Sequence, residues 1–365
     1  MRGSSAAKSL RASCSPAPRS PAASSTPRRW RSDPPVPRPE RDPRGPAVTP
    51  IPTLVRAIAG GPPAGRGVDH VVVVGHALDR LSDAWHRLGF RTTEIGVHPW
   101  GTINRTIRFD HSFVELLAIA EPGRIPPTES GAFSFGGFVA DRLARRGEGL
   151  AMLALASDDP DADRAAFAAA GLGLAAPFGF ERQAVAEDGS ERTVGFDLTF
   201  ATLRGSRIGE SCDAGFFTCR HRVPDDFWDA VPPRHPNTAV GLSAIVAVAP
   251  DPADYHIDLE AFAGLRALRA SSFGLALDLP RGTLEVLTPA AFRWRHGADS
   301  LPIEPRGLSL AGLRFAVADF GEAAAQLIAG GFPVLDRAES FVVADVAGVA
   351  VAFEPASPRP PQELR

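Results

Sequence analysis

The chain has 365 residues, of which 44% are hydrophobic and 22% are charged, and its formal net charge is −3. This length is sufficient for two ordinary domains, and the weak net charge gives no reason to expect a nucleic-acid partner. No apolar run reaches the roughly eighteen residues that a membrane span needs, and the three cysteines are too few for a disulfide framework, which favours a reducing compartment such as the cytoplasm.

Residues 1–66 are rich in Pro, Ser, Ala and Arg and carry no periodic apolar pattern. We therefore expect a disordered N-terminal extension. Its first thirty or so residues are basic and contain no acid, which is typical of an organellar transit peptide. The alternatives are a low-complexity extension or a start codon placed too far upstream. Lys8 is the only lysine in the chain, so the folded part cannot contain a P-loop lysine or a Schiff-base lysine.

The first folded stretch is predicted to have the order strand, helix and three strands. Residues 69–74, DHVVVV, are β-branched and short, which favours a buried strand. Apolar residues then recur at helical spacing between Leu81 and Leu88 and stop at Gly89, which predicts a one-sided helix with a glycine at its end. Three β-rich runs follow, at residues 91–97, 104–109 and 113–119.

Two polar residues of this stretch stand in apolar strands. Glu115 shares a strand face with Leu117 and lies in the run FVELLAI, where a carboxylate requires a compensating cation. His70 precedes a run of valines. Both residues have a structural alternative: Glu115 can pair with Arg105 or Arg108 on the neighbouring strand, and His70 can be a core histidine bonded to a backbone carbonyl.

The same order of elements recurs three times after a predicted connecting helix at residues 133–146. The second unit is expected over residues 150–221, and the prolines from 232 to 236 mark a linker. A degenerate third unit begins at residue 239, with a helix expected over residues 258–267, and a clear fourth unit begins at residue 310. The phrases LGF, AGL and GGF follow three of the four helices, which indicates an internal repeat.

The first unit resembles the opening module of the glyoxalase-like branch of the vicinal oxygen chelate superfamily. The resemblance rests on DHVV at 69–72, LGF at 88–90, HPWGTINRTIRF at 98–109 and FVELLAI at 113–119. It implies an α+β fold in which βαβββ modules pair into half-barrels, with two pairs in this chain: a glyoxalase-like domain at 67–221 and a second, degenerate paired domain at 238–355.

The resemblance also implies a divalent metal ion bound by His70 and Glu115, because the first and last strands of such a module lie side by side. The second module should supply the remaining ligands. Its places matching Glu115 and His70 are Cys219 and about Met152, and neither is a usual ligand there. His221, two residues after Cys219 on the same strand face, is the better candidate for a hard or borderline ion.

His98, Trp100 and Asn104 lie before and at the start of the strand predicted at residues 104–109. They are candidates for residues that line the substrate-binding cavity. The alternative is turn chemistry, because asparagine and glycine tolerate tight turns. His235 and Asn237, in HPNT, resemble a motif of the same family that follows the second unit, and the sequence leaves their role open.

We expect a metal-dependent enzyme of lyase, isomerase or dioxygenase type, with Glu115 as a catalytic residue, acting on a small oxygen-bearing substrate. The alternative is a metal-free protein that binds or sequesters small molecules in the same cavity. The expected partner is a small-molecule substrate. A homodimer of the chain is a second possibility beside a monomer.

Overall fold

The computed structural model describes residues 65–356 except 186–190, 204–213, 229–230, 267, 298–306 and 338–339. The predicted N-terminal extension lies outside these residues except at its last two positions. No helix in the described ranges is long and apolar enough to cross a membrane.

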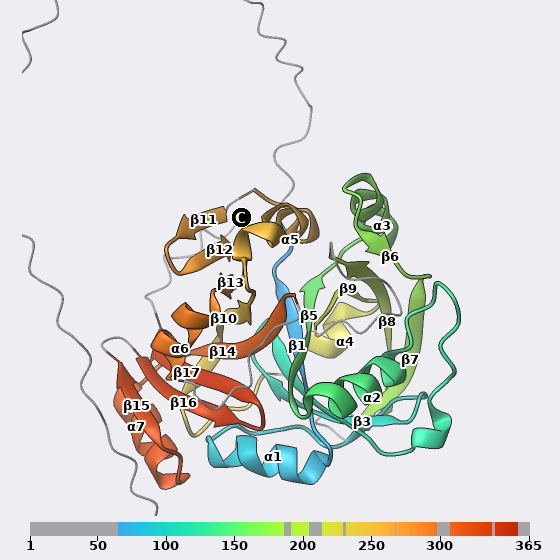
Figure 1. The fold of residues 1–365 in the computed structure, drawn as a ribbon. Helices are drawn as coiled ribbons and strands as arrows, with labels where there is room; N and C mark the ends of the chain where they lie inside the picture. Colours follow the sequence, from blue (N-terminus) through green and yellow to red (C-terminus); the bar gives the residue numbers. More distant parts are fainter. Residues whose placement is uncertain are drawn as a thin grey trace, which may run out of the picture. The chain divides into compact units, whose positions relative to one another are not determined.

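Four modules follow one another along the chain, as the repeat predicted (Figure 1). The first module contains β1 (Val68–Val74), α1 (Leu78–Arg87), β2 (Gly96–Val97), β3 (Thr102–Arg108) and β4 (Phe113–Ile119). The second contains β5 (Gly149–Ala156), α3 (Pro160–Ala169), β6 (Gly173–Leu174), β7 (Phe178–Val185), β8 (Glu191–Thr202) and β9 (Gly215–His221). The 3-10 turn η1 (Pro122–Arg124) and helix α2 (Phe135–Arg146) connect the two modules, and α4 (Pro224–Trp228) follows the second.

The third module is β10 (Ala239–Val248), η2 (Pro252–Tyr255), α5 (His256–Ala263), β11 (Leu268–Ser271), β12 (Gly274–Asp278) and β13 (Thr283–Leu287). Helix α6 (Pro289–His296) connects it to the fourth, which is β14 (Ser309–Val317), α7 (Phe320–Ala329), β15 (Val334–Arg337), β16 (Ser340–Val346) and β17 (Val349–Pro355). The third module is therefore less degenerate than expected, because β11 completes it. The predicted helix end was wrong: α5 stops at Ala263 because Gly264 adopts a left-handed φ of 69°.

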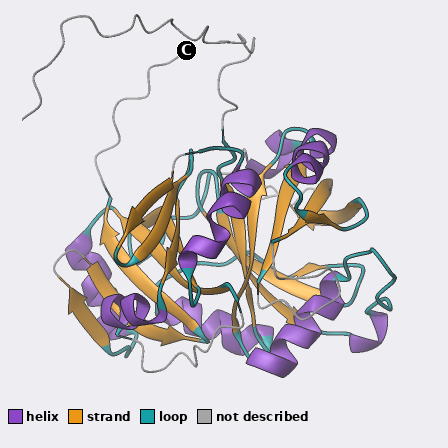
Figure 2. Ribbon diagram, turned by 45° about the horizontal axis from the view of Figure 1, so that its top comes forward, coloured by secondary structure: helices purple, strands orange, loops and turns teal. Residues whose placement is uncertain are grey.

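The modules pair in sequence order, which confirms the expected α+β fold of two paired half-barrels. The first two share a sheet of order β2-β3-β4-β1-β5-β9-β8-β6, with β7 on β8, and the last two share a sheet of order β11-β12-β13-β10-β14-β17-β16-β15. Within each module the first and last strands are parallel neighbours, and each pair joins through antiparallel first strands, β1 with β5 and β10 with β14. Figure 2 shows the strands gathered into the two sheets, with helices along their flanks.

The strand predicted over residues 91–97 was largely wrong, because only Gly96 and Val97 pair with β3. Glu94 and Ile95 are exposed, so no buried face holds this segment in a ladder. Gly89, in contrast, ends α1 as predicted, with a φ of 90°. A β-carbon there would lie 3.0 Å from the backbone nitrogen of Asn237, so the close approach of the linker also requires glycine.

Residues from all four modules contribute to one hydrophobic core. The Phe90 ring lies 4.7 Å from the Phe315 ring of β14, and the Trp85 ring lies 6.2 Å from it. At another contact, Phe167 of α3 lies 5.8 Å from Phe262 of α5. Burial of apolar surface therefore holds the two sheets together as well as building each of them.

The linker residues that the sequence left open have a structural role. Nδ1 of His235 accepts from the Arg91 backbone N–H at 3.1 Å, and its Nε2 lies 3.1 Å from the Arg108 carbonyl oxygen. Asn237 donates from Nδ2 to the Leu88 carbonyl at 3.0 Å. These bonds satisfy backbone groups of the first module and fix the start of the third.

Candidate functional site

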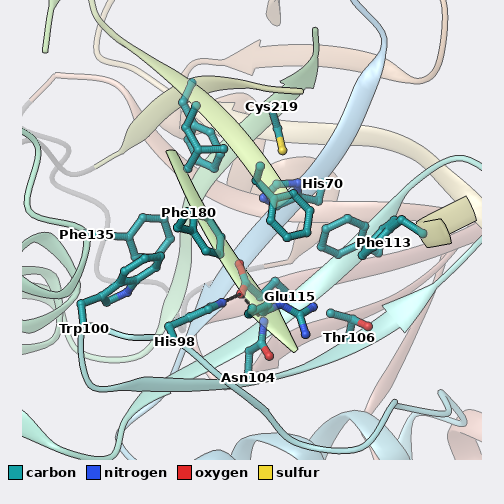
Figure 3. A pocket seen from close by; sticks show the side chains of 15 residues that line it. His70, His98, Trp100, Asn104, Thr106, Phe113, Glu115, Phe135, Phe180 and Cys219 are labelled. Atoms are coloured by element: carbon teal, nitrogen blue, oxygen red, sulfur yellow. Dashed lines mark hydrogen bonds and ion pairs between the residues drawn. The ribbon is translucent and has the colours of Figure 1, made fainter. Parts of the chain in front are cut away.

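A small cavity of about 40 Å³ opens on one face of the first sheet, between strands of both modules. Figure 3 shows side chains converging on it from several strands. The polar lining consists of His70, His98, Asn104, Thr106, Glu115, Arg182 and Cys219, and the apolar lining consists of Trp100, Phe113, Phe135, Phe180, Phe196, Leu198, Phe217 and Phe227. A few polar groups among many aromatic rings are typical of a small-molecule site.

Strand periodicity places these side chains on the cavity side of the sheet. Residues two apart share a face, so β4 contributes Phe113 and Glu115, and β9 contributes Phe217 and Cys219. Thr106 of β3 is the direct partner of Glu115 across the β3–β4 ladder. The sequence-predicted residues His70, His98, Trp100, Asn104 and Glu115 all line this cavity.

Glu115 is 5% exposed and is held by polar side chains of its own module. Asn104 donates from Nδ2 to Oε1 of Glu115 at 2.5 Å, and Nε2 of His98 lies 3.7 Å from the same oxygen (Figure 3). The structural alternative, an ion pair of Glu115 with Arg105 or Arg108, is not formed. Arg105 alternates to the opposite face and donates to the Thr93 carbonyl, and Arg108 donates to the carbonyl of Phe227 near the end of the strand.

His98 is a neutral imidazole at pH 7. Burial lowers its pKa to about 4, and the positive charge of Arg182 adds to that effect although Glu115 opposes it. Its Nδ1 lies 2.9 Å from Oγ1 of Thr102, and its ring stacks on Trp100 at 4.8 Å. The interactions fix the ring so that Nε2 faces Glu115.

His70 belongs to a buried polar chain that the sequence did not reveal. Its Nδ1 lies 2.6 Å from Oδ1 of Asp69, and Oδ2 of Asp69 lies 3.0 Å from Nε2 of His221. Burial acts to raise the pKa of Asp69, but the hydrogen bonds from His221 and His70 outweigh it and hold the pKa well below its ordinary value. Asp69 is therefore a carboxylate at neutral pH, although it is 2% exposed.

Asp69 reaches His70 because it is the extra residue of a β-bulge. Val68 pairs with Leu155 and His70 pairs with Ala154, so two steps along β1 match one step along β5. A bulge redirects a side chain that strict alternation would place on the other face. Strand periodicity alone therefore could not identify Asp69 as a site residue.

His221 is placed apart from the other two predicted metal ligands. It does not line the cavity with His70 and Glu115 but lines a neighbouring one together with Asp69, Cys219 and Arg220. It follows Cys219 on the same strand face, yet it stands at the last residue of β9, where its ring turns toward Asp69 and packs 4.5 Å from Phe227.

A sequence profile of the glyoxalase-like domain family matches residues 68–262, which is more than half of the chain. The chain belongs to this family. The glyoxalase-like chain is also a member of the vicinal oxygen chelate superfamily, as its paired modules indicate. No curated protein matches it in sequence.

The glyoxalase-like chain is similar to several solved structures, and one of them, with a TM-score above 0.5, supports the fold. A hypothetical protein from Staphylococcus aureus superimposes with a TM-score of 0.55 at 11% identity, over 80% of this chain and 99% of that one. A mutant of 4-hydroxymandelate synthase from Streptomyces coelicolor gives 0.48 at 11% identity, over 80% and 94%. Methylmalonyl-CoA epimerase from Streptomyces coelicolor gives 0.29 at 18% identity, over 44% and 99%. At such identities a likeness concerns the fold and not the activity.

The donor atoms of the glyoxalase-like cavity fit an incomplete metal site. His70 presents the arrangement of a metal-ligating histidine, because a carboxylate holds one ring nitrogen while the other has no partner among the described residues. Glu115 adds a carboxylate on the adjacent parallel strand. Ligand atoms of Asp69, His70 and Cys219 also lie within 4.8 Å of one another, but burial raises the pKa of the Cys219 thiol well above its usual value. Cys219 is thus protonated at neutral pH unless an ion displaces its proton.

The strand registers identify the second-module counterparts of the two ligands. His70 pairs directly with Ala154 across the β1–β5 junction, and the β5–β9 register then makes Cys219 the counterpart of Glu115. The residue opposite His70 is thus Ala154, whereas Met152, the expected match, lies opposite Val72. Alanine cannot bind a metal, so the second module offers a thiol alone.

The second half-barrel surrounds the equivalent carboxylate differently. Glu285 occupies the register position of Glu115, since Glu285 pairs with Val246 of β10 as Glu115 pairs with Val72 of β1. Arg295 and Arg314 bind its two oxygens at 2.7 and 2.8 Å, and Arg314 also pairs with Glu354. Arginines therefore neutralise the carboxylate of Glu285 in the second half-barrel. The equivalent carboxylate of Glu115 has only the amide of Asn104 and the neutral imidazole of His98 beside it.

Proposed function

We propose that this protein is a divalent-metal-dependent enzyme whose active site is the cavity of the first half-barrel. The observation that carries the proposal is the Asp69–His70 bond of 2.6 Å, which leaves Nε2 of His70 free in the cavity that Glu115 also lines. Carboxylates hold metal-ligating histidines in this way, since the bond fixes the tautomer and raises the basicity of the ligand nitrogen.

His70 and Glu115 would hold the ion, and Cys219 is a further donor, since its sulfur lies within 4.8 Å of a ring nitrogen of His70. A bound divalent ion would act as a Lewis acid toward two neighbouring oxygens of a small substrate, which serves lyase, isomerase and dioxygenase chemistry. With only two or three protein ligands, several coordination positions stay open to substrate or water.

The remaining lining residues orient and enclose the substrate. Asn104 fixes one oxygen of Glu115, so the second oxygen is the one that faces a ligand. The rings of Phe135 and Phe180 stand edge to face with His98, at centroid distances of 6.4 and 5.7 Å. The ring of Trp100 packs against the same two phenylalanines at 5.5 and 4.8 Å. Such an apolar wall excludes water and strengthens the electrostatic interactions inside the cavity.

A second candidate function is a metal-free binding protein that uses the same cavity. The observation that favours it is the compensation of Glu115 by protein groups alone: Asn104 donates to it, and the positive charge of Arg182 lies in the same cavity. Seven aromatic rings could then hold an apolar ligand without any ion.

Elemental analysis of the purified full-length protein distinguishes the two functions. The enzyme proposal expects a stoichiometric divalent metal in the wild type and its loss in His70→Ala and Glu115→Gln. Asp69→Asn should weaken metal binding by about 10- to 100-fold, the usual effect of removing the partner of a ligand. His221→Gln should retain the ion, because His221 faces Asp69 and not the cavity.

Glu285→Gln is the matched control, since it makes the same change at the same register position of the other half-barrel. It should leave metal content unchanged. Wild-type protein that binds no divalent metal when supplied in excess would refute the enzyme proposal and leave the binding protein.

A further inference from the structure

Arg182 is a charged residue on the cavity face of β7, a position that strand alternation reserves for apolar side chains. Phe180 and Arg182 line the cavity, whereas Glu181 and Gln183 between and after them are exposed. In the sequence FGFERQ, Phe178, Phe180 and Arg182 alternate with exposed residues, so Arg182 shares the inward face of the strand with the two phenylalanines. That intrusion resembles those of His70 and Glu115, and sequence reasoning overlooked it.

The guanidinium of Arg182 makes no hydrogen bond or ion pair with any residue that the structure describes. Its Cζ lies over the ring of Phe196, 5.9 Å from the centroid, in a cation–π contact. Glu115 lines the same cavity, but the two charges approach no closer than the 4.0 Å limit of an ion pair. Arg105 and Arg108, by comparison, both donate to backbone carbonyls.

A half-buried guanidinium without a partner is costly unless a ligand or water satisfies it. Its fork of N–H donors matches the two oxygens of a carboxylate. One cation among aromatic rings suits a singly charged group on an apolar body better than a phosphate, which carries more charge and more acceptor oxygens to satisfy.

We propose that Arg182 binds a carboxylate of the ligand, and that the substrate class of this cavity is a small carboxylic acid with an apolar or aromatic body. The term substrate rests on the enzyme proposal, whereas the anion-binding role of Arg182 does not. The carboxylate would bind at the guanidinium of Arg182, and the rings would enclose the rest of the molecule.

Isothermal titration of the full-length protein with phenylacetate and its neutral isostere phenylacetamide tests this role. Wild type should bind phenylacetate more tightly than phenylacetamide. Arg182→Gln should weaken phenylacetate binding by about 10- to 100-fold, the worth of a charge-assisted hydrogen bond, and leave phenylacetamide unaffected. Arg182→Lys should fall between, because it keeps the charge but loses the fork.

Arg269→Gln is the control, since it removes an exposed arginine of the other half-barrel that pairs with Asp278. It should bind both compounds as wild type does, and equal thermal midpoints would exclude misfolding of the Arg182 variants. Equal affinities for the two compounds in wild type, no binding of phenylacetate at all, or an undiminished preference in Arg182→Gln would each overturn the proposal.

Each titration is repeated after treatment with a chelator, because a bound ion could also attract a carboxylate. A preference that survives chelation and depends on Arg182 supports the role whether or not the protein binds a metal. A preference that disappears with the ion refutes it and leaves the enzyme proposal intact. Absence of metal from the wild type refutes the enzyme proposal alone.

Discussion

Replacement of Glu115 by glutamine, compared with the same replacement of Glu285, separates a ligand-binding carboxylate from a structural one. The two residues hold equivalent register positions in the two half-barrels. Glutamine has nearly the same shape as glutamate and removes only the charge. Any difference between the variants therefore comes from what surrounds each carboxylate.

The expected cost at Glu115 is small. Its one short hydrogen bond comes from the neutral donor Asn104, and the carbonyl oxygen of glutamine can accept the same bond. Arg182 makes no direct contact with Glu115, so the change strands no paired cation. The loss is that of charge assistance in one hydrogen bond, about 1 kcal/mol in the free energy of unfolding.

The expected cost at Glu285 is larger. Both its oxygens bind arginines, and its side chain is 12% exposed. Removing one partner of a buried pair costs roughly 3–5 kcal/mol. Arg314 keeps Glu354, however, and Arg295 is 37% exposed. We therefore expect a cost of about 2–3 kcal/mol, or a lowering of the melting temperature by roughly 3–5 °C.

The assay is denaturant unfolding of chelator-treated full-length protein, combined with metal per chain measured before chelation. Chelation matters because an ion bound only by the folded state adds stability by mass action. Glu115→Gln should lose metal at little cost in stability, and Glu285→Gln should do the reverse. A loss of several kcal/mol in Glu115→Gln with metal unchanged would show that Glu115 is a structural counterion and that our assignment is wrong.

Three further changes test the fold. Removal of residues 1–64 should leave the melting temperature unchanged. Removal of residues 1–66 should lower it, because Arg66 pairs with Asp163 and donates to the Phe262 carbonyl. Equal melting temperatures for the two truncations would show that the contacts of Arg66 do not stabilise the fold. Phe315→Ala should cost about 3–5 kcal/mol in urea unfolding because the ring is fully buried where the sheets meet, and a cost below about 1 kcal/mol would argue against a shared core. Burial lowers the pKa of His296 to about 3 from 6.5, so unfolding takes up a proton between these values and stability falls with acidification through this window. Since both ring nitrogens lack partners in the described residues, His296→Leu should unfold less readily at acidic pH without loss at pH 7, and an unaltered pH profile would contradict this.

The sequence determined the order of elements and the inward side chains within single strands. Hydrophobic alternation is a local property, so β1 and β4 and the intrusions of His70 and Glu115 could be predicted from their own segments. The repeat of this order also predicted the pairing of modules, which the sheet order confirms. By the same logic the inward Arg182 was predictable, because its signal is an arginine at the core position of a strand.

Only the tertiary structure decided which groups meet. Asp69 joins His70 and His221 because a bulge against β5, a strand eighty residues away in sequence, redirects it. His221 contacts Asp69 for the same reason, since its partner is the redirected carboxylate. The fate of Glu285 likewise depends on Arg295 and Arg314, which belong to α6 and β14. Each outcome depends on a contact between distant segments, and the period of a single strand carries no information about the partner that will lie beside it.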